Sequence, residues 1–442
     1  MAGGPGARAA LGNAEGNDEA DALAPVPTSA QVARRGGSEP GRVRGAAERG
    51  GGVVEYFPGE YAWSSAVDVA VMAGGSPADI HRVLGPLGSR ARVDRASWAR
   101  AWSAMAHEQE SRAEDDVLAG RTACAAERYL RASIYHSNGQ RNEPPGPTKS
   151  EAYAAALQAF ADAREVGALP LDVVHVDSPD GLLPGYLIRV PGAAEPPPVV
   201  VVFGGIDMTK ELAFAIVRDM FAARGIACLV IDTPGTGELL RLRGVPSRPD
   251  SEVVMSAIVD HLETRSDVDA SRVAVLGISM GGYHAVRAAA FEPRVGACVS
   301  WGAVWDYGEI WAERWRTRSD SLSLPWFQLP WVLGVEGVDQ ALERIRAWSL
   351  TDVWPRLRQP LLVLHGAEDR QIPVRDAYRA FAAAGSADKQ LRVFAADEGG
   401  SHHIQSDDPR PARTAIGEWV ARVLAPAAQL VGTTADGPPA TD

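Results

Sequence analysis

The chain has 442 residues, of which 46% are hydrophobic and 23% charged, and its formal net charge is −12. This length exceeds one ordinary domain, and an acidic chain without a basic stripe is a poor candidate for binding nucleic acid. No apolar run approaches the roughly 18 residues that a membrane helix needs, so we expect no membrane partner. The three cysteines lie far apart in the sequence, which argues against a disulfide scaffold or a zinc ribbon.

The two ends of the chain have a composition that does not favour folding. Residues 1–52 contain 12 glycines and 12 alanines, and the first aromatic residue is Tyr56. Such a segment buries too little apolar surface to offset its ordering entropy, so we predict a disordered leader over 1–52 and a flexible tail over 425–442. The leader lacks the continuous apolar stretch of a secretory signal, and we therefore expect a cytoplasmic protein.

Residues 53–168 have a helical pattern. Ser76 followed by Pro77 is typical of a helix start, with serine as the N-cap and proline in the first position. Trp98, Trp102 and Met105 recur at helical spacing, and no strand-like alternation interrupts the block. We predict a helical domain of four to six helices.

Residues 169–424 have the pattern of an α/β domain. Alternation over 173–177 and 185–190 indicates an antiparallel hairpin. Short apolar runs then alternate with helical stretches, which predicts parallel strands buried on both faces. These runs are 199–203, 227–231, 273–276, 297–300, 361–364 and 391–394. The predicted fold class is α/β, with a mostly parallel sheet flanked by helices.

The strongest chemical motif is Gly-x-Ser-x-Gly around Ser279. It follows an apolar strand and precedes an alanine-rich helix, and small residues at Gly277 and Gly281 allow the sharp turn that such an elbow requires. The turn exposes the serine hydroxyl above the sheet, beside a helix N-terminus. We predict that Ser279 is a nucleophile.

A serine nucleophile needs a base, which is itself oriented by an acid, and in folds with this elbow both follow the serine. Asp369 comes just after a predicted buried strand and is the candidate acid, with Glu368 as the alternative. Two adjacent histidines supply the base. We favour His402, because a glycine two residues before the histidine is the commoner arrangement. His403 is the alternative, or else a substrate contact.

The oxyanion that forms in acyl transfer needs two backbone N–H donors. Met280, the residue after the nucleophile, is expected to supply one. The other is expected from the loop after the first core strand, where Gly205 is favoured and Ile206 is close behind.

Motifs for cofactors are weak. Residues 234–240 begin like a dinucleotide fingerprint but lack its last glycine, and no phosphate-binding GxxxxGK[ST] occurs. His107 and Glu110 do not form HExxH, the helix signature of zinc proteases. We expect neither a cofactor nor a catalytic metal.

Tryptophan is concentrated in an insert over 301–355, between two predicted strands. Eight of the twelve lie there: Trp301, Trp305, Trp311, Trp315, Trp326, Trp331, Trp348 and Trp354. Core packing is the first interpretation, an aromatic wall for a large flat substrate is the second, and an interfacial lipase lid is the third. On the second interpretation, the candidate substrate contacts are Trp301, Trp305, Tyr307 and His403. Three nearby arginines are expected to be solvated, with contact to an acidic group of the substrate as the alternative: Arg314, Arg316 and Arg318.

The elbow, together with the order Ser279, Asp369, His402, resembles the α/β-hydrolase superfamily. Residues 119–135, 183–186, 204–211 and 232–238 resemble a branch that holds FrsA-like esterases, 2,6-dihydroxypseudooxynicotine hydrolase and fungal polyketide-shortening hydrolases. The resemblance covers about residues 56–423. It implies a helical cap over the core, an active site between them and often a homodimer. Phe203 departs from the branch, in which histidine commonly precedes the glycine pair.

The function that these observations indicate is a cofactor-independent serine hydrolase with a small-molecule substrate. The resemblance implies cleavage of an ester or of a C–C bond next to a ketone, and the aromatic insert favours a bulky, aromatic or polyketide-like substrate. An acyl transferase, cyclase or eliminating lyase of secondary-metabolite biosynthesis on the same fold is the alternative. A non-enzymatic binding protein is a third hypothesis, against which the complete candidate triad argues.

Overall fold

The computed structural model describes residues 56–88, 94–318 and 324–426. The predicted leader, and all but two residues of the predicted tail, lie outside these ranges. Among the helices of these three ranges, none combines the length and apolar character that crossing a membrane requires.

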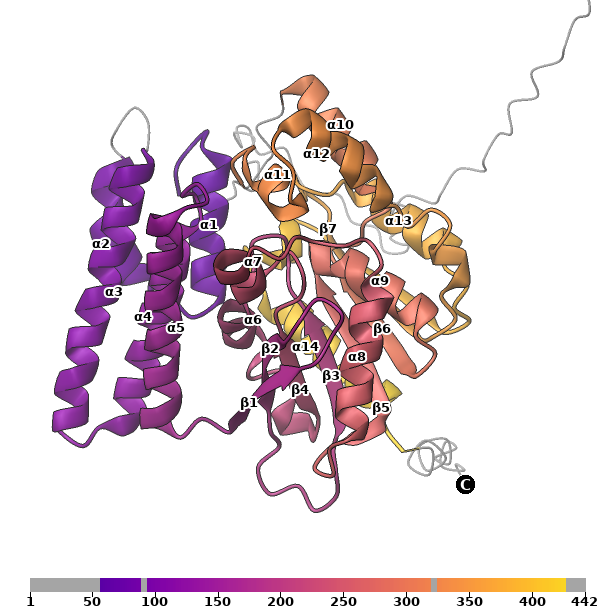
Figure 1. Ribbon diagram of the computed structural model, residues 1–442, viewed down its shortest axis with the longest axis horizontal. Coiled ribbons are helices and arrows are strands. Elements are labelled where there is room, and N and C mark those ends of the chain that lie inside the picture. Colours follow the sequence, from indigo (N-terminus) through magenta and orange to yellow (C-terminus); the bar gives the residue numbers. More distant parts are fainter. Residues whose placement is uncertain (1–55, 89–93, 319–323, 427–442) are drawn as a thin grey trace, which may run out of the picture. The chain divides into compact units, whose positions relative to one another are not determined.

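The first described elements are helices. They are α1 (Tyr61–Met72), α2 (Pro77–Gly88), α3 (Arg95–Leu118), α4 (Thr122–Gln140) and α5 (Pro147–Gly167). The predicted helix start is confirmed, because the Ser76 hydroxyl accepts a hydrogen bond from the Asp79 N–H at 3.3 Å, and Pro77 opens α2. Trp98 and Trp102 of α3 are fully buried. The Trp98 indole donates to the carbonyl of Asn138 at 2.9 Å, which ties α3 to α4 (Figure 1).

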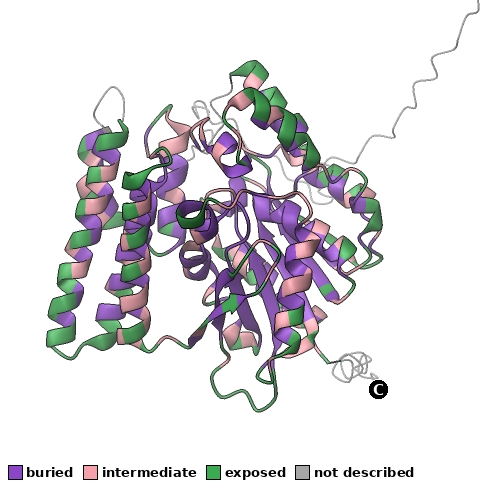
Figure 2. Ribbon diagram, in the orientation of Figure 1, coloured by how far each residue is buried: buried purple, intermediate pink, exposed green. Residues whose placement is uncertain are grey.

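A mixed sheet follows these N-terminal helices. Its strands are β1 (Leu171–Val176), β2 (Leu183–Ile188), β3 (Pro198–Phe203), β4 (Ala227–Ile231), β5 (Asp269–Ile278), β6 (Val295–Trp301), β7 (Leu361–Gly366) and β8 (Lys389–Phe394). Their order is β1-β2-β4-β3-β5-β6-β7-β8. The β1–β2 hairpin is antiparallel and joins β4 in antiparallel fashion, whereas the pairs from β4 to β8 are parallel. Each predicted apolar run lies within one of these strands, and Figure 2 shows the central strands of the sheet as buried.

Both faces of the sheet are covered, as alternating residues of β3 illustrate. Val200 and Val202 pack with α6 (Lys210–Val217), α14 (Arg410–Val423) and the N-terminal helices. Val199, Val201 and Phe203 pack on the other face. That face is covered by α8 (Ser251–Glu263), α9 (Met280–Phe291), α13 (Val374–Ala383) and part of the insert. A continuous valine run therefore contributes to two hydrophobic cores, one on each face of the sheet, as expected for a parallel strand.

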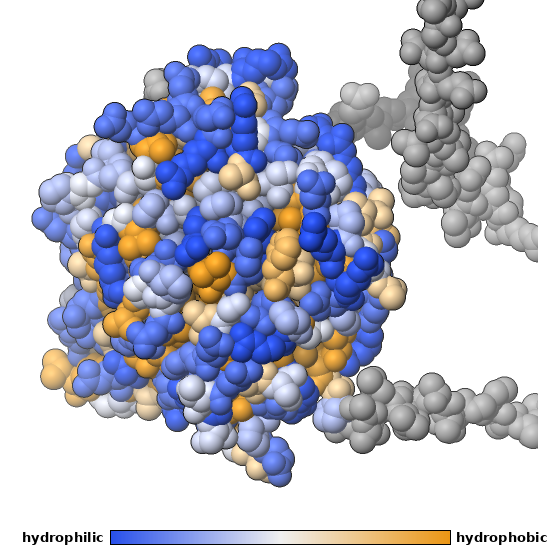
Figure 3. Space-filling view, turned by 45° about the vertical axis from the view of Figure 1, so that its right-hand side comes forward, coloured by the Kyte–Doolittle hydropathy of each residue, from blue (hydrophilic) through white to orange (hydrophobic). Residues whose placement is uncertain are grey.

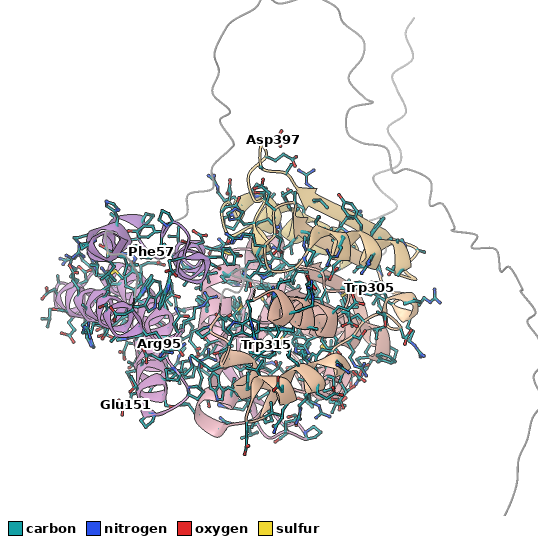
Figure 4. The ribbon with its side chains drawn as sticks, turned by 90° about the horizontal axis from the view of Figure 1, so that it is seen from above. Phe57, Arg95, Glu151, Trp305, Trp315 and Asp397 are labelled. Atoms are coloured by element: carbon teal, nitrogen blue, oxygen red, sulfur yellow. The ribbon has the colours of Figure 1, made fainter. Side chains whose placement is uncertain are left out.

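The insert between β6 and β7 contains α10 (Tyr307–Thr317), α11 (Gln328–Leu333) and α12 (Val338–Arg344). Asp306 caps α10, because its side chain accepts a hydrogen bond from the Glu309 N–H at 2.8 Å. Figure 4 shows Trp305 and Trp315 on this insert and Arg95 at the near edge of α3. The Arg95 guanidinium lies 6.0 Å from the ring centre of Phe327, so the N-terminal helices and the insert are in contact.

The tryptophans of the insert divide between buried and partly exposed positions. Four are at most 2% exposed, namely Trp301, Trp311, Trp348 and Trp354. The solvent side of α10 carries Glu309, Glu313 and Arg316. On the face in Figure 3, hydrophobic residues form separate spots among hydrophilic ones. The burial of the four tryptophans favours core packing, and the charged solvent side of α10 argues against the apolar face of an interfacial lipase lid.

Candidate active site

The turn from β5 to α9 holds Ser279 in a strained backbone conformation. Its φ of 59° is positive, which costs free energy for a residue with a side chain. A Cβ at Gly277 would lie 1.9 Å from the Gly281 carbonyl oxygen, and one at Gly281 would lie 2.0 Å from that of Phe203. Only glycines allow the strand, the turn and the neighbouring loop to approach so closely. The predicted elbow is therefore present, with Ser279 at its tip.

Ser279 is the first member of a hydrogen-bonded line of three side chains. His403 Nε2 lies 2.8 Å from Ser279 Oγ. On the other side of the ring, His403 Nδ1 lies 2.7 Å from Asp369 Oδ2. The three groups come from the end of β5, the loop after β7 and the loop after β8, which meet at the carboxyl edge of the sheet.

The structure corrects the choice between the two histidines, because His403 and not His402 joins Ser279 to Asp369. The His402 backbone is extended, with φ −85° and ψ 177°, and its N–H donates to Asp407 Oδ1 at 3.0 Å. A Cβ at Gly366 would lie 2.3 Å from the His402 carbonyl oxygen, so this backbone is pressed against the end of β7. Neighbouring side chains of an extended segment point in opposite directions, and only the second one faces the serine.

Asp369 is buried but remains ionised. Burial by itself would raise the pKa of this carboxyl, yet the neighbouring His403 and the backbone N–H of Ile372 bring it below its ordinary value. Asp369 Oδ1 accepts hydrogen bonds from the N–H groups of Gln371 at 2.7 Å and Ile372 at 2.9 Å. The alternative acid, Glu368, is exposed and accepts from the Ser401 hydroxyl instead.

The loop after β3 lies beside the serine. A Cβ at Gly205 would be 3.3 Å from Ser279 Cβ and 3.7 Å from its Oγ. Met280 is the first residue of α9, where N–H groups have no partner within the helix. Ile206, the other candidate donor, is the next residue of the loop and is half-buried. The structure thus places Gly205 and Met280 beside Ser279, with Ile206 one residue further along the loop.

This loop is held from two sides by arginines that the sequence did not single out. Arg141, just after α4, forms an ion pair with Asp207 at 2.6 Å. Arg241 of α7 (Gly237–Arg243) donates to the Asp207 carbonyl at 2.8 Å. Arg141 belongs to the N-terminal helical region, so that region fixes the position of a loop that borders the serine. Long-range pairs of this kind leave no local sequence signal.

Tyr307, a predicted substrate contact, is 5% exposed, and its hydroxyl lies close enough to Ser279 for the serine to affect its pKa. Burial raises the pKa of its hydroxyl well above the ordinary value, so it is neutral and can donate. Arg314 lies one turn further along α10 from Trp311, is buried, and donates to the carbonyl of Gln371. The expectation that Arg314 is solvated is therefore wrong, although Arg316 and Arg318 are exposed. The 307, 311, 314 spacing places all three residues on one helix face.

A tyrosine of the N-terminal helices also reaches this region. The hydroxyl of Tyr61 on α1 lies beside the side chain of Gln371, whose backbone N–H donates to Asp369. Burial and the charge of Asp369 raise the pKa of Tyr61 well above its ordinary value. The Arg370 guanidinium lies 4.4 Å from the centre of the Tyr61 ring. No local sequence pattern indicates this contact, because Tyr61 and Gln371 are far apart in the chain.

Trp301 and Trp305, both predicted as substrate contacts, have different surroundings. Trp301 is fully buried, and its indole donates to Gln405 Oε1 at 2.6 Å. It therefore braces the loop that carries His403 rather than forming a wall for substrate, which corrects the prediction. Trp305 is half-buried, and its backbone N–H donates to Asp376 Oδ2 at 3.2 Å. His403, also predicted as a substrate contact, occupies the central position described above.

Hydrogen bonds to the backbone indicate a structural role for His365 and Asp232. His365 is fully buried, with Nε2 2.8 Å from the Ile372 carbonyl. Asp232 accepts from the backbone N–H groups of Lys210 and Glu238 at 2.8 and 2.9 Å. Both side chains hydrogen-bond the backbone of loops beside the sheet.

A cavity lies where the N-terminal helices meet the insert. Its volume is about 580 Å³, within the usual range of small-molecule sites. It is lined by Glu60, Ala62, Trp63, Asp94, Arg95, Asn142, Leu324 and Pro325. Glu60, Ala62 and Trp63 come from the start of α1, the helix that also carries Tyr61.

The sequence matches models of two protein families. The model described as esterase FrsA-like matches residues 87–312, about half of the chain. The prolyl oligopeptidase family model matches residues 213–426. The two overlap across the elbow and together run from the N-terminal helices to α14.

Several curated relatives are hydrolases. A 2,6-dihydropseudooxynicotine hydrolase of Paenarthrobacter nicotinovorans is 29% identical over 295 residues, which cover 65% of this chain and 75% of the relative. The hydrolyase poxO of Penicillium oxalicum is 30% identical over 374 residues, covering 73% of this chain and 88% of the relative.

Solved structures give the same result. The crystal structure of 2,6-dihydroxy-pseudo-oxynicotine hydrolase matches with a TM-score of 0.68 and 25% identity, and covers 81% of this chain and 96% of that one. AbyA5 matches with a TM-score of 0.59 at 20% identity, over 82% of this chain and 99% of that one, which bears on the fold alone. The matches confirm the predicted α/β-hydrolase fold with its N-terminal helical region.

Proposed function

This chain belongs to the FrsA-like esterase family, and from that premise we propose that it is a serine hydrolase acting through Ser279, His403 and Asp369. The observation that carries the proposal is the unbroken line of hydrogen bonds, 2.8 Å from Ser279 to His403 and 2.7 Å from His403 to Asp369. Serine is a weak nucleophile unless a base accepts its proton, and this line supplies the base and its orienting acid.

In the proposed reaction, His403 Nε2 takes the hydroxyl proton as Ser279 Oγ attacks a carbonyl carbon. Asp369 fixes the ring through Nδ1 and stabilises its protonated form. The tetrahedral intermediate collapses by breaking a C–O bond or a C–C bond next to the carbonyl. His403 returns the proton to the departing alkoxide or carbanion. Water, activated by the same histidine, then releases the acyl group from the serine.

The N–H groups of Met280 and Gly205 are proposed to stabilise the oxyanion of that intermediate, with Ile206 as the alternative donor. The close approach of Gly205 to Ser279 supports this assignment. Loss of one such donor typically costs about 10²–10³ in kcat. Tyr307 is proposed as a further donor beside the serine, because its hydroxyl is neutral and lies close to Ser279.

We propose that residues 53–168 act as a cap on the catalytic domain over 169–424. The insert over 301–355 is proposed to border the entrance to the active site. The cavity of about 580 Å³ at the cap–insert boundary and the Tyr61–Gln371 contact support this arrangement. Trp63, Leu324 and Pro325 give the cavity apolar walls. A bulky aromatic or polyketide-like ester or ketone is the proposed substrate class, and the name of the pseudooxynicotine hydrolase relative is consistent with an aromatic ketone.

A fluorophosphonate probe on the purified full-length chain tests the nucleophile. We expect one probe per chain on Ser279, identified by peptide mass spectrometry, and none on the Ser279→Ala variant. His402→Ala should label at close to the rate of the parent protein, whereas His403→Ala should label at least about a thousandfold more slowly. Labelling that depends on His402 and not on His403 would overturn the assignment.

Product analysis distinguishes the reaction types. Aryl esters and aryl β-diketones are incubated with the parent protein and with Ser279→Ala, in water enriched in ¹⁸O. Incorporation of ¹⁸O into a carboxylic acid product supports hydrolysis. An acyl product carried by an added alcohol or amine, without ¹⁸O, would instead support an acyl transferase.

A further inference from the structure

A second group of imidazole and carboxylate side chains lies in the N-terminal helices, away from Ser279. His107 Nδ1 is 2.8 Å from Glu110 Oε2, and His136 Nε2 is 2.8 Å from Glu110 Oε1. The two imidazole rings are 5.2 Å apart between centres. One potential ligand atom from each residue lies within 4.8 Å of the other two.

The helices place these three groups together by ordinary helical geometry. His107 and Glu110 are three residues apart on α3 and therefore share one face. His136 comes from the last turn and a half of α4, which packs along α3. Its ring is 4% exposed, whereas that of His107 is 66% exposed. The site is thus anchored on a buried histidine and open to solvent on one side.

A cavity of about 640 Å³ adjoins the group, between α3, α4 and α5. His107 and His136 both contribute to its wall. Small residues at Ala99, Ala104 and Gly139 leave this space open. Glu151, at another part of the wall, lies at the outer edge of the N-terminal helices (Figure 4).

We propose that His107, Glu110 and His136 bind a divalent transition-metal cation of the Zn²⁺ class. Two imidazoles and one carboxylate are a ligand set that zinc favours, with bonds of about 2.0–2.2 Å. Ligand atoms on a tetrahedral zinc ion are about 3.4 Å apart on this basis. The two nitrogen–oxygen distances of 2.8 Å are shorter than this value, and the limit of 4.8 Å on all the ligand-atom distances is longer. Small side-chain movements would therefore bring the three ligand atoms to the spacing that zinc requires.

The proposed site has three protein ligands, which leaves a fourth position for water or a small ligand from the adjoining cavity. It joins α3 to α4, so a bound ion would clip the two helices together and stabilise the folded chain. The HExxH motif places two histidine ligands four residues apart on one helix. The proposed site instead takes its ligands from two helices, so the absence of HExxH does not argue against it. This is why the sequence did not indicate the site.

The test uses the full-length chain, stripped with a chelator and titrated with ZnCl₂ by calorimetry. We expect one equivalent to bind, and His107→Gln to weaken the affinity at least about tenfold, since even outer-shell partners of a metal are worth that much. His107 is largely exposed, so its variant should fold. His175→Gln, an exposed histidine on β1, is the matched control and should bind like the parent.

Two further readouts locate the ion. A few degrees of rise in Tm with excess Zn²⁺ are expected for the parent and for His175→Gln, but not for His107→Gln. Co²⁺ in place of Zn²⁺ should give visible absorption bands that His107→Gln and Glu110→Gln both lose. The proposal is overturned if the stripped chain binds less than about a tenth of an equivalent, or if binding survives His107→Gln and is lost in His403→Gln.

Discussion

Asp369 and Asp68 are both largely buried carboxyl groups near the histidine loop, and their acidities move in opposite directions. Asp369 lies in the catalytic core and has a pKa below its ordinary value, because His403 offsets the cost of burial. Asp68, on α1, has a pKa raised to about 7 by burial and by the charge of Asp407. Asp407 is the residue that holds the backbone N–H of His402.

The difference shows that burial alone does not determine the state of an acid. A buried carboxylate with a histidine and two backbone donors stays charged and can orient a base. The same group facing a second carboxylate takes up a proton instead. The first arrangement serves catalysis in the proposed mechanism. The second makes the stability of the folded chain depend on pH through Asp68.

Removing the partner of Asp369 should have the largest effect on activity. We expect His403→Ala to lower kcat by about 10⁴–10⁶, because the base and the charge that balances Asp369 are lost together. Ester hydrolysis under single-turnover conditions measures this. His402→Ala is the matched control, with a change of less than about threefold. Equal losses in both variants would contradict the geometry of the triad.

Changing Asp369 itself should cost somewhat less. Asp369→Asn keeps the shape of the side chain but removes its charge, and we expect kcat to fall by about 10⁴. Glu368→Gln, at the neighbouring acid, should retain activity within a few-fold. If Glu368→Gln were the more damaging variant, Asp369 would not be the orienting acid.

Tyr307→Phe tests a partner of Ser279 that carries no charge. Loss of one neutral hydrogen bond is worth about 1 kcal/mol, so kcat/KM should fall about fivefold to tenfold. Phenylalanine fills the same buried space, and Tm should therefore change by no more than a few degrees. Tyr378→Phe, at an exposed tyrosine of α13, provides the control. A loss above about a thousandfold would mean that Tyr307 takes part directly in proton transfer.

Asp68→Asn should leave activity nearly unchanged but alter the pH dependence of stability. The folded pKa of about 7 exceeds that of an unfolded aspartate, so the folded chain holds a proton that the unfolded chain has lost between about pH 4 and pH 7. Stability therefore falls as pH rises through this window. Asparagine removes this dependence.

Denaturant unfolding should thus show a gain of a few kcal/mol for Asp68→Asn at pH 8 and almost none at pH 4, given about 1.4 kcal/mol for each unit of pKa difference. Asp260→Asn, at an exposed aspartate of α8, serves as the control. An equal gain at both pH values would point to a packing effect and would contradict the raised pKa of Asp68.

Much of the fold was predictable because its signals are local. Each predicted apolar run coincides with a strand, since a buried parallel strand requires consecutive apolar residues. The elbow at Ser279 was predictable for the same reason, because Gly277 and Gly281 are demanded by close backbone contacts within a few residues. Asp369 followed from its place directly after a strand.

Other features depend on residues far apart in the chain. Trp301 is part of a tryptophan-rich insert, yet it is buried against Gln405. Arg314 lies in a charged stretch, yet it points inward to Gln371. Tyr61 and Arg141 reach the catalytic region from the N-terminal helices. No local sequence pattern indicates which distant part of the chain will cover a given side chain.

The sequence by itself determined the α/β class, the helical N-terminal region, the nucleophile elbow and the acid after β7. Only the tertiary structure decided between His402 and His403. Periodicity and turn residues indicate the backbone conformation of a segment. They are the same whether the base is His402 or the next residue of the loop, so they cannot distinguish the two. The direction of each imidazole depends instead on Asp407 and Gly366, which fix the backbone of His402 from outside the histidine pair.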